Sequence, residues 1–293
     1  MAKNHFVLVL GFATILLATS CNEEDIQISE SDYAILSNTL DIPEVYFDYE
    51  GLTLPEHLDN NGIRDKDNTP NSNNVTNSGA TLGRVLFYDK NLSINNTVSC
   101  ASCHLQDRGF ADPEVLSVGF DGKLTGRNSM GIANAKFYRN GKFFWDERAN
   151  TLEDQVLMPI QDHIEMGMSL EELIPKLQAL DYYQILFNQA FEEKTITEAY
   201  ISEALSQFIR SIVSFESRYD DGLAQINGRL RPGVDIPVLT DKENLGRRLF
   251  GQGGCADCHQ TNLFVGDEAR NNGLDAVFTD IGLGEITGNA NDN

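Results

Sequence analysis

Two copies of one short cysteine motif constrain this chain more than any other feature. The first copy lies in "SCASCHLQDRGF", residues 99 to 110, and the second lies in "GCADCHQ", residues 254 to 260. Each copy places two cysteines three positions apart, with a histidine directly after the second cysteine. The chain has five cysteines, and four of them belong to the two motifs: Cys100, Cys103, Cys255 and Cys258.

A similar apolar hexad precedes each motif. "LGRVLF" occupies residues 82 to 87 and "LGRRLF" occupies residues 245 to 250. The first hexad begins 18 positions before its motif cysteine, and the second begins 10 positions before. An apolar helix that leads twice into the same motif predicts two related units, each wrapped around the same kind of bound group.

Three kinds of site use Cys-x-x-Cys. A four-cysteine zinc site pairs two such motifs about 15 to 20 residues apart, whereas Cys100 and Cys255 are 155 positions apart. Neither zinc nor a redox disulfide explains a histidine after both motifs. Attachment of c-type haem explains every residue, because the two thiols bond to the haem and the imidazole ligates its iron. The sequence therefore predicts two c-type haems, with His104 and His259 as iron ligands.

The sixth ligand of each iron separates an electron carrier from a catalyst, because only an open position can bind oxygen species. No histidine lies between His104 and His163. We therefore expect no histidine on the far side of the first iron. Methionines of the mature chain are ordinarily core residues rather than ligands; they are Met130, Met158, Met166 and Met168.

The N-terminus is similar to a bacterial lipoprotein signal. Lys3 precedes an apolar run over residues 6–18 that is too short to span a bilayer, and small residues then lead to Cys21. This resemblance predicts an exported protein in the periplasm or cell envelope, anchored by lipid on Cys21. The alternative is a plain secretory signal with a chance cysteine; both alternatives place the protein outside the cytoplasm.

Composition narrows the class of partner. The 293 residues are 41% hydrophobic, which is typical of a soluble globular protein with room for two domains. The formal net charge is −22, from 44 acidic and 22 basic residues. This charge argues against nucleic acid and anionic membrane surfaces as partners and is compatible with a basic or neutral protein.

Helical patterns dominate the middle of the chain, after an Asn- and Asp-rich segment, residues 59–79, that reads as loop. Ser169 and Glu172 form a capping box in front of a helix with an apolar stripe. Apolar residues at helical spacing then predict one buried helical stripe over residues 197–219. The stripe comprises Ile201, Ala204, Leu205, Phe208, Ile212 and Phe215.

The stretch from Arg127 to Gly167 reads "RNSMGIANAKFYRNGKFFWDERANTLEDQVLMPIQDHIEMG". Together with both haem motifs and "LGRVLFYDKNLSINNTVSCASCH", it resembles the bacterial di-haem cytochrome c peroxidase family, which includes the MauG-type enzymes. The resemblance covers roughly residues 79 to 288.

The resemblance implies roles for single residues. The first haem would react with peroxide and the second would receive electrons. Trp145, the only tryptophan, matches the family's tryptophan between the haems, and Glu165 matches its distal acid–base group. Gln155 and Pro159 match pocket positions, and Asn128 matches a residue that helps to hold a calcium ion between the domains.

The role implied for Glu165 is chemically sound. Cleavage of peroxide requires a proton to move from the inner to the leaving oxygen, and one carboxylate can perform both transfers. Without the resemblance, Glu165 would read as a solvated surface group, and Trp145 as a core aromatic. Because "LSVGFDGKLTGRNS" lacks the removable histidine of many family members, we expect a first haem that is open at rest.

These observations predict a mainly α fold of two cytochrome c-like haem domains packed together. The expected organisation is a signal peptide at 1–20, a tether and Asn/Asp-rich segment at 21–79, a peroxidatic haem domain at 80–220 and an electron-transfer haem domain at 221–293. Only 34 residues follow His259, without Met, Tyr, His or Lys. The second domain is therefore expected to be incomplete at its C-terminus.

The predicted function is reduction of hydrogen peroxide to water, with electrons from a small cytochrome c or a cupredoxin. Two alternatives remain. One is a MauG-like oxidase that modifies a partner protein, and the other is a di-haem electron carrier without catalysis. The carrier would need both irons filled by ligands, and the chain offers few candidates for the first.

Overall fold

The computed structural model describes residues 28–59, 62–231, 233–270, 276 and 280–289. Those residues form helices and loops with no strand, and contain only isolated bridges such as that between Leu105 and Ala111. The predicted mainly α class is confirmed. The helices are α1 (Glu30–Ser37), α2 (Glu56–Asp59), α3 (Asn77–Tyr88), α4 (Cys100–Cys103), α5 (Leu152–Gln161), α6 (Leu170–Gln178), α7 (Asp181–Phe191), α8 (Glu198–Ser211), α9 (Arg218–Gln225), α10 (Asp241–Gln252) and α11 (Leu283–Thr287). Short 3₁₀ turns are η1 (Ile63–Lys66), η2 (Lys90–Leu92), η3 (Gln106–Arg108), η4 (Ala135–Phe137) and η5 (Cys255–Asp257).

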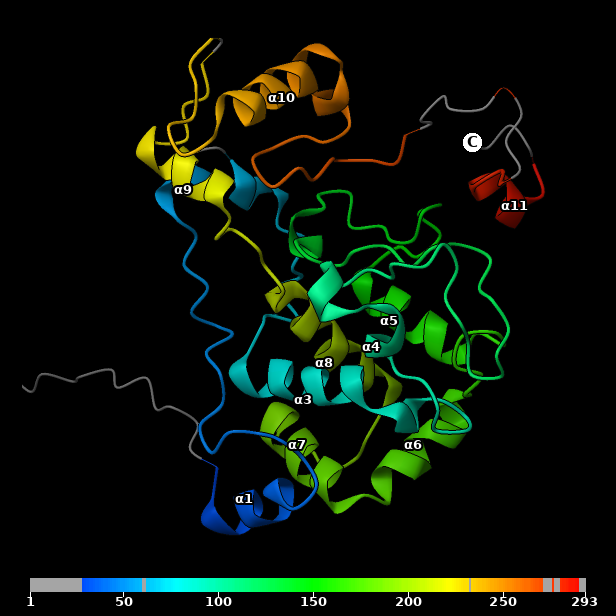
Figure 1. Cartoon of the computed structure of the whole chain (residues 1–293). Helices are drawn as coiled ribbons and strands as arrows, with labels where there is room; N and C mark the ends of the chain where they lie inside the picture. The colour runs from blue at the N-terminus through cyan, green and yellow to red at the C-terminus, as the bar shows by residue number, and fades with distance from the viewer. Residues whose placement is uncertain (1–27, 60–61, 232, 271–275, 277–279, 290–293) are drawn as a thin grey trace, which may run out of the picture.

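Helices α3 and α8 cross at the centre of the molecule (Figure 1). Two glycines one turn apart on α3 make the close approach possible. A Cβ atom at Gly83 would lie 1.9 Å from the Ala204 carbonyl oxygen, and one at Gly79 would lie 2.0 Å from Oε1 of Gln207. Any side chain at Gly83 would therefore separate the two helices.

The main core surrounds this crossing and includes residues of α5, α6 and α7. Its innermost residues are almost fully shielded from solvent: Leu82, Leu86, Phe87, Ile160, Leu173, Leu177, Tyr183, Leu186, Phe187, Ile201, Ala204 and Leu205. The helical spacing found in the sequence thus marks the faces that pack together. Burial of one such leucine or phenylalanine contributes about 1.5–3 kcal/mol.

Two helix predictions have different outcomes. The cap at Ser169 is confirmed, because its hydroxyl accepts the N–H of Glu172 at the start of α6. The prediction of one helical stripe over 197–219 is wrong in length, since α8 ends at Ser211. The next residues, including the β-branched Ile212, leave helical geometry, and Ser217 caps a separate helix, α9.

A buried polar clamp holds the Asn-rich segment, which was predicted as loop, against the helical core. Arg210 of α8 is 2% exposed and donates to Glu153 of α5 and to Oδ1 of Asn68. Gln207 also donates to Asn73, at 2.8 Å. The segment contains the 3₁₀ turn η1, whose Ile63 is buried. It is thus mostly loop, but it is packed rather than solvated.

The chain after α8 forms a smaller region. Figure 1 shows α9 and α10 together on one side of the body and α1 on the opposite side. A second apolar cluster joins this region to the N-terminal segment and to η4, through Leu54, Leu58, Ile63, Phe137 and Leu263. The proposed domain boundaries stay predictions.

The described residues include no helix long and apolar enough to cross a membrane. The predicted signal peptide, residues 1–20, and Cys21 lie outside the described residues.

Candidate functional site

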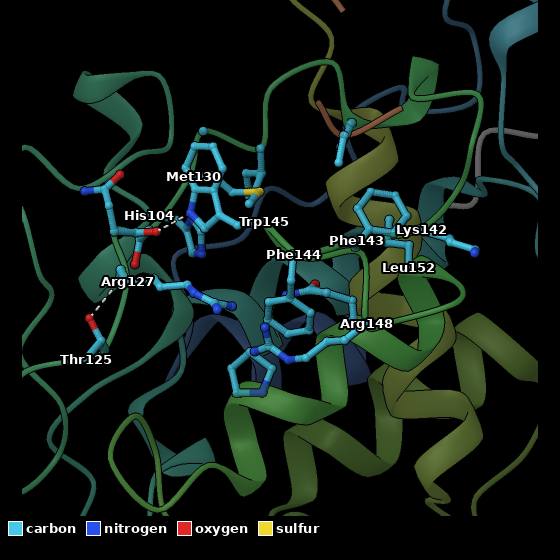
Figure 2. Close-up of a pocket in the computed structure, with 18 of the residues that line it drawn as sticks. His104, Thr125, Arg127, Met130, Lys142, Phe143, Phe144, Trp145, Arg148 and Leu152 are labelled. Atoms are coloured by element: carbon cyan, nitrogen blue, oxygen red, sulfur yellow. Dashed lines mark hydrogen bonds between the residues drawn. The ribbon is translucent and has the colours of Figure 1, made fainter. Parts of the chain in front are cut away.

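A cavity of about 1060 Å³ adjoins the first cysteine motif (Figure 2). Its walls come from the motif itself, the loop over residues 125–148, helix α5 and the turn that follows α5. Ile209 of α8 and residues that follow the second motif also contribute to the wall; the latter are Phe264, Val265, Ala269, Asp280, Glu285 and Ile286. The predicted site residues that share this cavity are His104, Asn128, Trp145, Gln155, Pro159 and Glu165.

The geometry at His104 suits an iron ligand. Its backbone N–H donates to the Cys100 carbonyl at 2.9 Å, which places the ring directly after α4. Its Nδ1 lies 2.9 Å from the Phe110 carbonyl oxygen. An Nδ1–H that donates there leaves the Nε2 lone pair for a metal. Burial lowers the pKa of His104, although hydrogen bonds to the backbone of Phe110 and Met130 oppose this effect.

A tight turn after α5 carries Glu165 into the cavity. Asp162 accepts the N–H groups of Ile164 and Glu165 at 2.8 and 3.0 Å. A neighbouring loop approaches this turn so closely that a Cβ atom at Gly119 would lie 1.7 Å from the Ile164 carbonyl oxygen. The Phe120 N–H then donates to the Glu165 carbonyl at 3.0 Å. The backbone of Glu165 is therefore fixed from both sides.

The environment of Glu165 changes its acidity. Burial raises the pKa of this carboxyl to about 7, the negative charge of Asp162 adds to the rise, and Arg148 opposes it. A carboxyl with a pKa near the working pH can both accept and return a proton. This property agrees with the acid–base role predicted for Glu165.

Trp145 sits in a strained loop that ionic contacts hold in place. Phe144 and Glu147 adopt positive φ angles of 72° and 53°, which cost non-glycine residues about 1–3 kcal/mol each. Between them, the buried carboxylate of Asp146 accepts hydrogen bonds from Arg127 and Arg148. Burial opposes ionisation of Asp146, yet these bonds hold its pKa below the usual value.

The indole of Trp145 is itself anchored. Its Nε1–H donates to the Asn128 carbonyl at 2.9 Å, while its side chain remains 57% exposed. The Asn128 side-chain amide donates to the Glu114 carbonyl at 2.7 Å. The described residues contain no cluster of three or more His, Cys, Asp or Glu that could hold a metal ion. Calcium at Asn128 stays a prediction.

Sequence reasoning missed two arginines at this site. The Arg148 guanidinium carbon lies 3.5 Å from the centre of the Phe144 ring, inside the cavity wall (Figure 2). Arg127 pairs with Asp146 and also with Asp280 and Glu285 near the end of the chain. The only sequence signal for either was its place within the family-like stretch.

One further histidine and one methionine lie on the cavity wall. The expectation that no histidine lies on the far side of the first iron stays a prediction, but the exposed His163 lines the cavity. The cause is the turn after α5, which brings the residues before Glu165 to the cavity. Met130 also lines it, whereas Met166 and Met168 are 4% and 3% exposed and belong to the core.

The second motif repeats the local geometry of the first. The His259 N–H donates to the Cys255 carbonyl at 2.9 Å, as His104 does to Cys100. The ring of Phe250, at the end of the second hexad, lies 6.1 Å from the His259 ring; Phe87 lies 6.4 Å from His104. Cys255, Cys258 and His259 are all exposed. The predicted internal repeat is confirmed locally, but only the first motif adjoins the cavity.

The residues at the first motif fit a haem. Cys100 and Cys103 are partly buried free thiols beside a histidine whose Nε2 can ligate iron. The cavity is at the upper end of the about 300–1,000 Å³ range of small-molecule sites. An aromatic and cationic wall of Trp145, Phe144 and Arg148 suits a large conjugated anion.

Comparison with known proteins agrees with this site. Residues 77–227 match the sequence model of a family described as di-haem cytochrome c peroxidase. The methylamine utilization protein MauG of Methylorubrum extorquens is 35% identical over 219 residues, which are 74% of this chain and 59% of MauG. The cytochrome c peroxidase of Escherichia coli (strain K12) is 31% identical over 70% of this chain and 41% of its own length.

A solved structure shows the same fold. The crystal structure of a MauG-like protein associated with microbial copper homeostasis superposes with a TM-score of 0.65 at 32% identity, and covers 83% of this chain and 72% of that one. This chain spans less than two-thirds of the MauG and Escherichia coli relatives. The extent of these matches shows that the chain belongs to the di-haem cytochrome c peroxidase family.

Proposed function

We propose that this chain is a peroxidase that reduces hydrogen peroxide to water with electrons from a small redox protein, a cytochrome c or a cupredoxin. The observation that carries the proposal is one cavity bordered by His104, Glu165 and Trp145. Two covalently bound c-type haems would be held by the four motif cysteines, with His104 and His259 on the irons. A haem bound there supplies a redox-active iron at which the O–O bond of peroxide is cleaved.

Glu165 moves the proton in this proposal. Its carboxylate accepts the proton of the inner peroxide oxygen and delivers it to the leaving oxygen, which departs as water. Because burial raises its pKa to about 7, the carboxyl exists in both the ionised and the protonated form near neutral pH, so it can accept a proton and return it. Protonation below that value removes the acceptor, so the peroxide-dependent rate should fall as the pH drops from 8 to 6. Gln155 and Pro159 shape the wall beside it.

Trp145 carries electrons between the two haem sites. Its fixed indole N–H and its place on the cavity wall keep it in one orientation. The net charge of −22 favours a basic or neutral donor protein.

A MauG-like oxidase that modifies a partner protein is the second candidate. The similarity to proteins named MauG supports it. A pure electron carrier is disfavoured by an acid–base group beside the first iron site.

The sequence alone supports the proposed location. The lipoprotein-like signal, residues 1–20, favours export to the periplasm or cell envelope and a lipid anchor on Cys21.

Stopped-flow mixing of the haem-loaded protein with peroxide tests the proposal. Glu165→Gln should slow the peroxide-dependent step by about 10²–10⁴-fold, which is about 3–5 kcal/mol of barrier, and leave electron entry intact. Trp145→Phe should show the reverse, a normal first reaction and slow re-reduction. Glu171→Gln, at an exposed position on α6, is the matched control. A normal peroxide reaction in Glu165→Gln would remove the acid–base assignment.

A further inference from the structure

Tyr138 and Glu147 form a phenol–carboxylate pair that the proposed peroxidase chemistry leaves unassigned. The Tyr138 hydroxyl donates directly to Oε1 of Glu147, and both side chains are partly buried. Burial raises the pKa of Tyr138, and the hydrogen bond to Glu147 adds to the rise. The phenol therefore stays protonated and points its proton at an acceptor that can take it.

The pair is held rigidly. The side-chain amide of Asn68 donates to the Tyr138 carbonyl at 3.0 Å, and Asn68 is itself bonded by the buried Arg210. The Asn140 amide donates to the same Glu147 oxygen at 2.9 Å. A preorganised donor and acceptor need little rearrangement when a proton moves between them.

Its position joins the two haem-binding regions. Tyr138 lines the cavity that also contains His104 and Trp145. The Glu147 carboxylate accepts the backbone N–H of Ala269 at 2.9 Å, and Ala269 lies ten positions after His259. The pair therefore spans the wall of the first site and the segment that follows the second motif.

We propose that Tyr138 is a second redox-active side chain of this enzyme, with Glu147 as its proton acceptor; the proposal rests on the peroxidase function above. One electron leaves the Tyr138 phenol for the peroxide-oxidised first haem site. The phenolic proton moves to the Glu147 carboxylate, so that a neutral tyrosyl radical faces a carboxylic acid. An electron from the second haem site then reduces the radical, and Glu147 returns the proton. Charge and atoms balance over the cycle.

Other tyrosines lack this combination. Tyr88 donates to the amide oxygen of Gln106, which cannot take up the proton. Tyr182 and Tyr183 both donate to Asp89, but neither lines the cavity beside His104. Among the described tyrosines, Tyr138 alone has a carboxylate partner and a place on that wall.

Freeze-quench paramagnetic resonance of the full chain with both haems bound tests the proposal. Peroxide is added without donor in a Trp145→Phe background, and ring-deuterated tyrosine identifies a tyrosyl signal. We expect Tyr138→Phe to abolish this signal and the matched control Tyr88→Phe to retain it. Glu147→Gln should lower the yield by about tenfold or more, since a positioned proton acceptor contributes about 10²–10⁴-fold.

The outcomes separate this inference from the proposed function. A tyrosyl signal that persists in Tyr138→Phe would overturn the inference and direct attention to Tyr183. An unchanged yield in Glu147→Gln would overturn the role of the carboxylate. If peroxide leaves the haem spectrum of the unaltered protein unchanged, the peroxidase function itself fails. Peptide mapping for oxidised Tyr138 after peroxide treatment gives a second readout that needs no turnover.

Discussion

The two repeats contain similar hexads, but the first hexad is buried and the second is exposed. Leu82 and Leu86 of α3 are fully shielded from solvent, whereas the matching Leu245 and Leu249 of α10 are 50% and 55% exposed. Yet both motifs place a phenylalanine ring about 6 Å from the motif histidine and close the same backbone hydrogen bond. The two motifs therefore share their local geometry, although only the first hexad is buried.

The matching glycines of the two hexads, Gly83 and Gly246, also differ in their surroundings. Gly83 lies against the Ala204 carbonyl of α8, while the matching Gly246 has open space where a Cβ atom would be. The first unit thus has a helix that covers its hexad, and the described part of the second unit offers none in that position. The two units therefore differ in whether another helix packs against the hexad, and less in the hexad itself.

Removal of the motif cysteines is the broadest test of the comparison. If each haem is bound by its own pair of thiols, as proposed, Cys100→Ala with Cys103→Ala should eliminate one haem and Cys255→Ala with Cys258→Ala the other. Haem content after expression in an export-competent host gives the readout. Only the first double variant should also lose the reaction with peroxide at once. Retention of both haems in either variant contradicts the assignment.

Truncation of the matching leucines, Leu86 and Leu249, compares how much each contributes to the free energy of unfolding. Leu86→Ala should lower the free energy of unfolding by about 2–5 kcal/mol, because it leaves a cavity in the core. Leu249→Ala should change it by about 0.5 kcal/mol or less. Urea denaturation of both variants checks this. Equal losses would mean that the apolar face of α10 is covered in solution.

Alanine at the matched glycines is the finest test. Gly83→Ala should destabilise the protein by about 1–3 kcal/mol, since its methyl group would push α3 away from α8. Gly246→Ala should stabilise α10 by up to about 1 kcal/mol, since alanine is the better helix former. Thermal unfolding of the two variants should therefore shift in opposite directions. If both variants shifted the unfolding temperature in the same direction, the two glycines would not differ in packing as described.

Local features of the fold were predictable from the sequence. The cap at Ser169, the apolar stripe Ile201 to Phe208 and the repeat all follow from spacing between near neighbours, which backbone geometry fixes. The end of α8 at Ser211 was not predictable in this way. Apolar spacing continues to Phe215, but that residue joins the second cluster instead of the helix face.

For the candidate site too, the sequence predicted some residues but not the contacts that depend on the fold. His104, Trp145 and Glu165 were predicted for one site, and the structure brings them to one cavity. The Arg148–Phe144 contact and the Tyr138–Glu147 pair depend on the fold of a loop with positive φ angles, which no residue spacing reveals. His163 reached the cavity only through the shape of the turn after α5.

The packing of α8 against α3 also has a consequence for the order in which the chain folds and its cysteines become buried. Glu198, the first residue of α8, follows Cys103 by 95 positions. A chain delivered N-terminus first presents the thiols of the first motif well before α8 arrives to close the core. If a haem is attached at Cys100 and Cys103, as proposed, we expect attachment before that core closes. Cys255 and Cys258 are exposed in the folded chain, so attachment there would not depend on the order of folding.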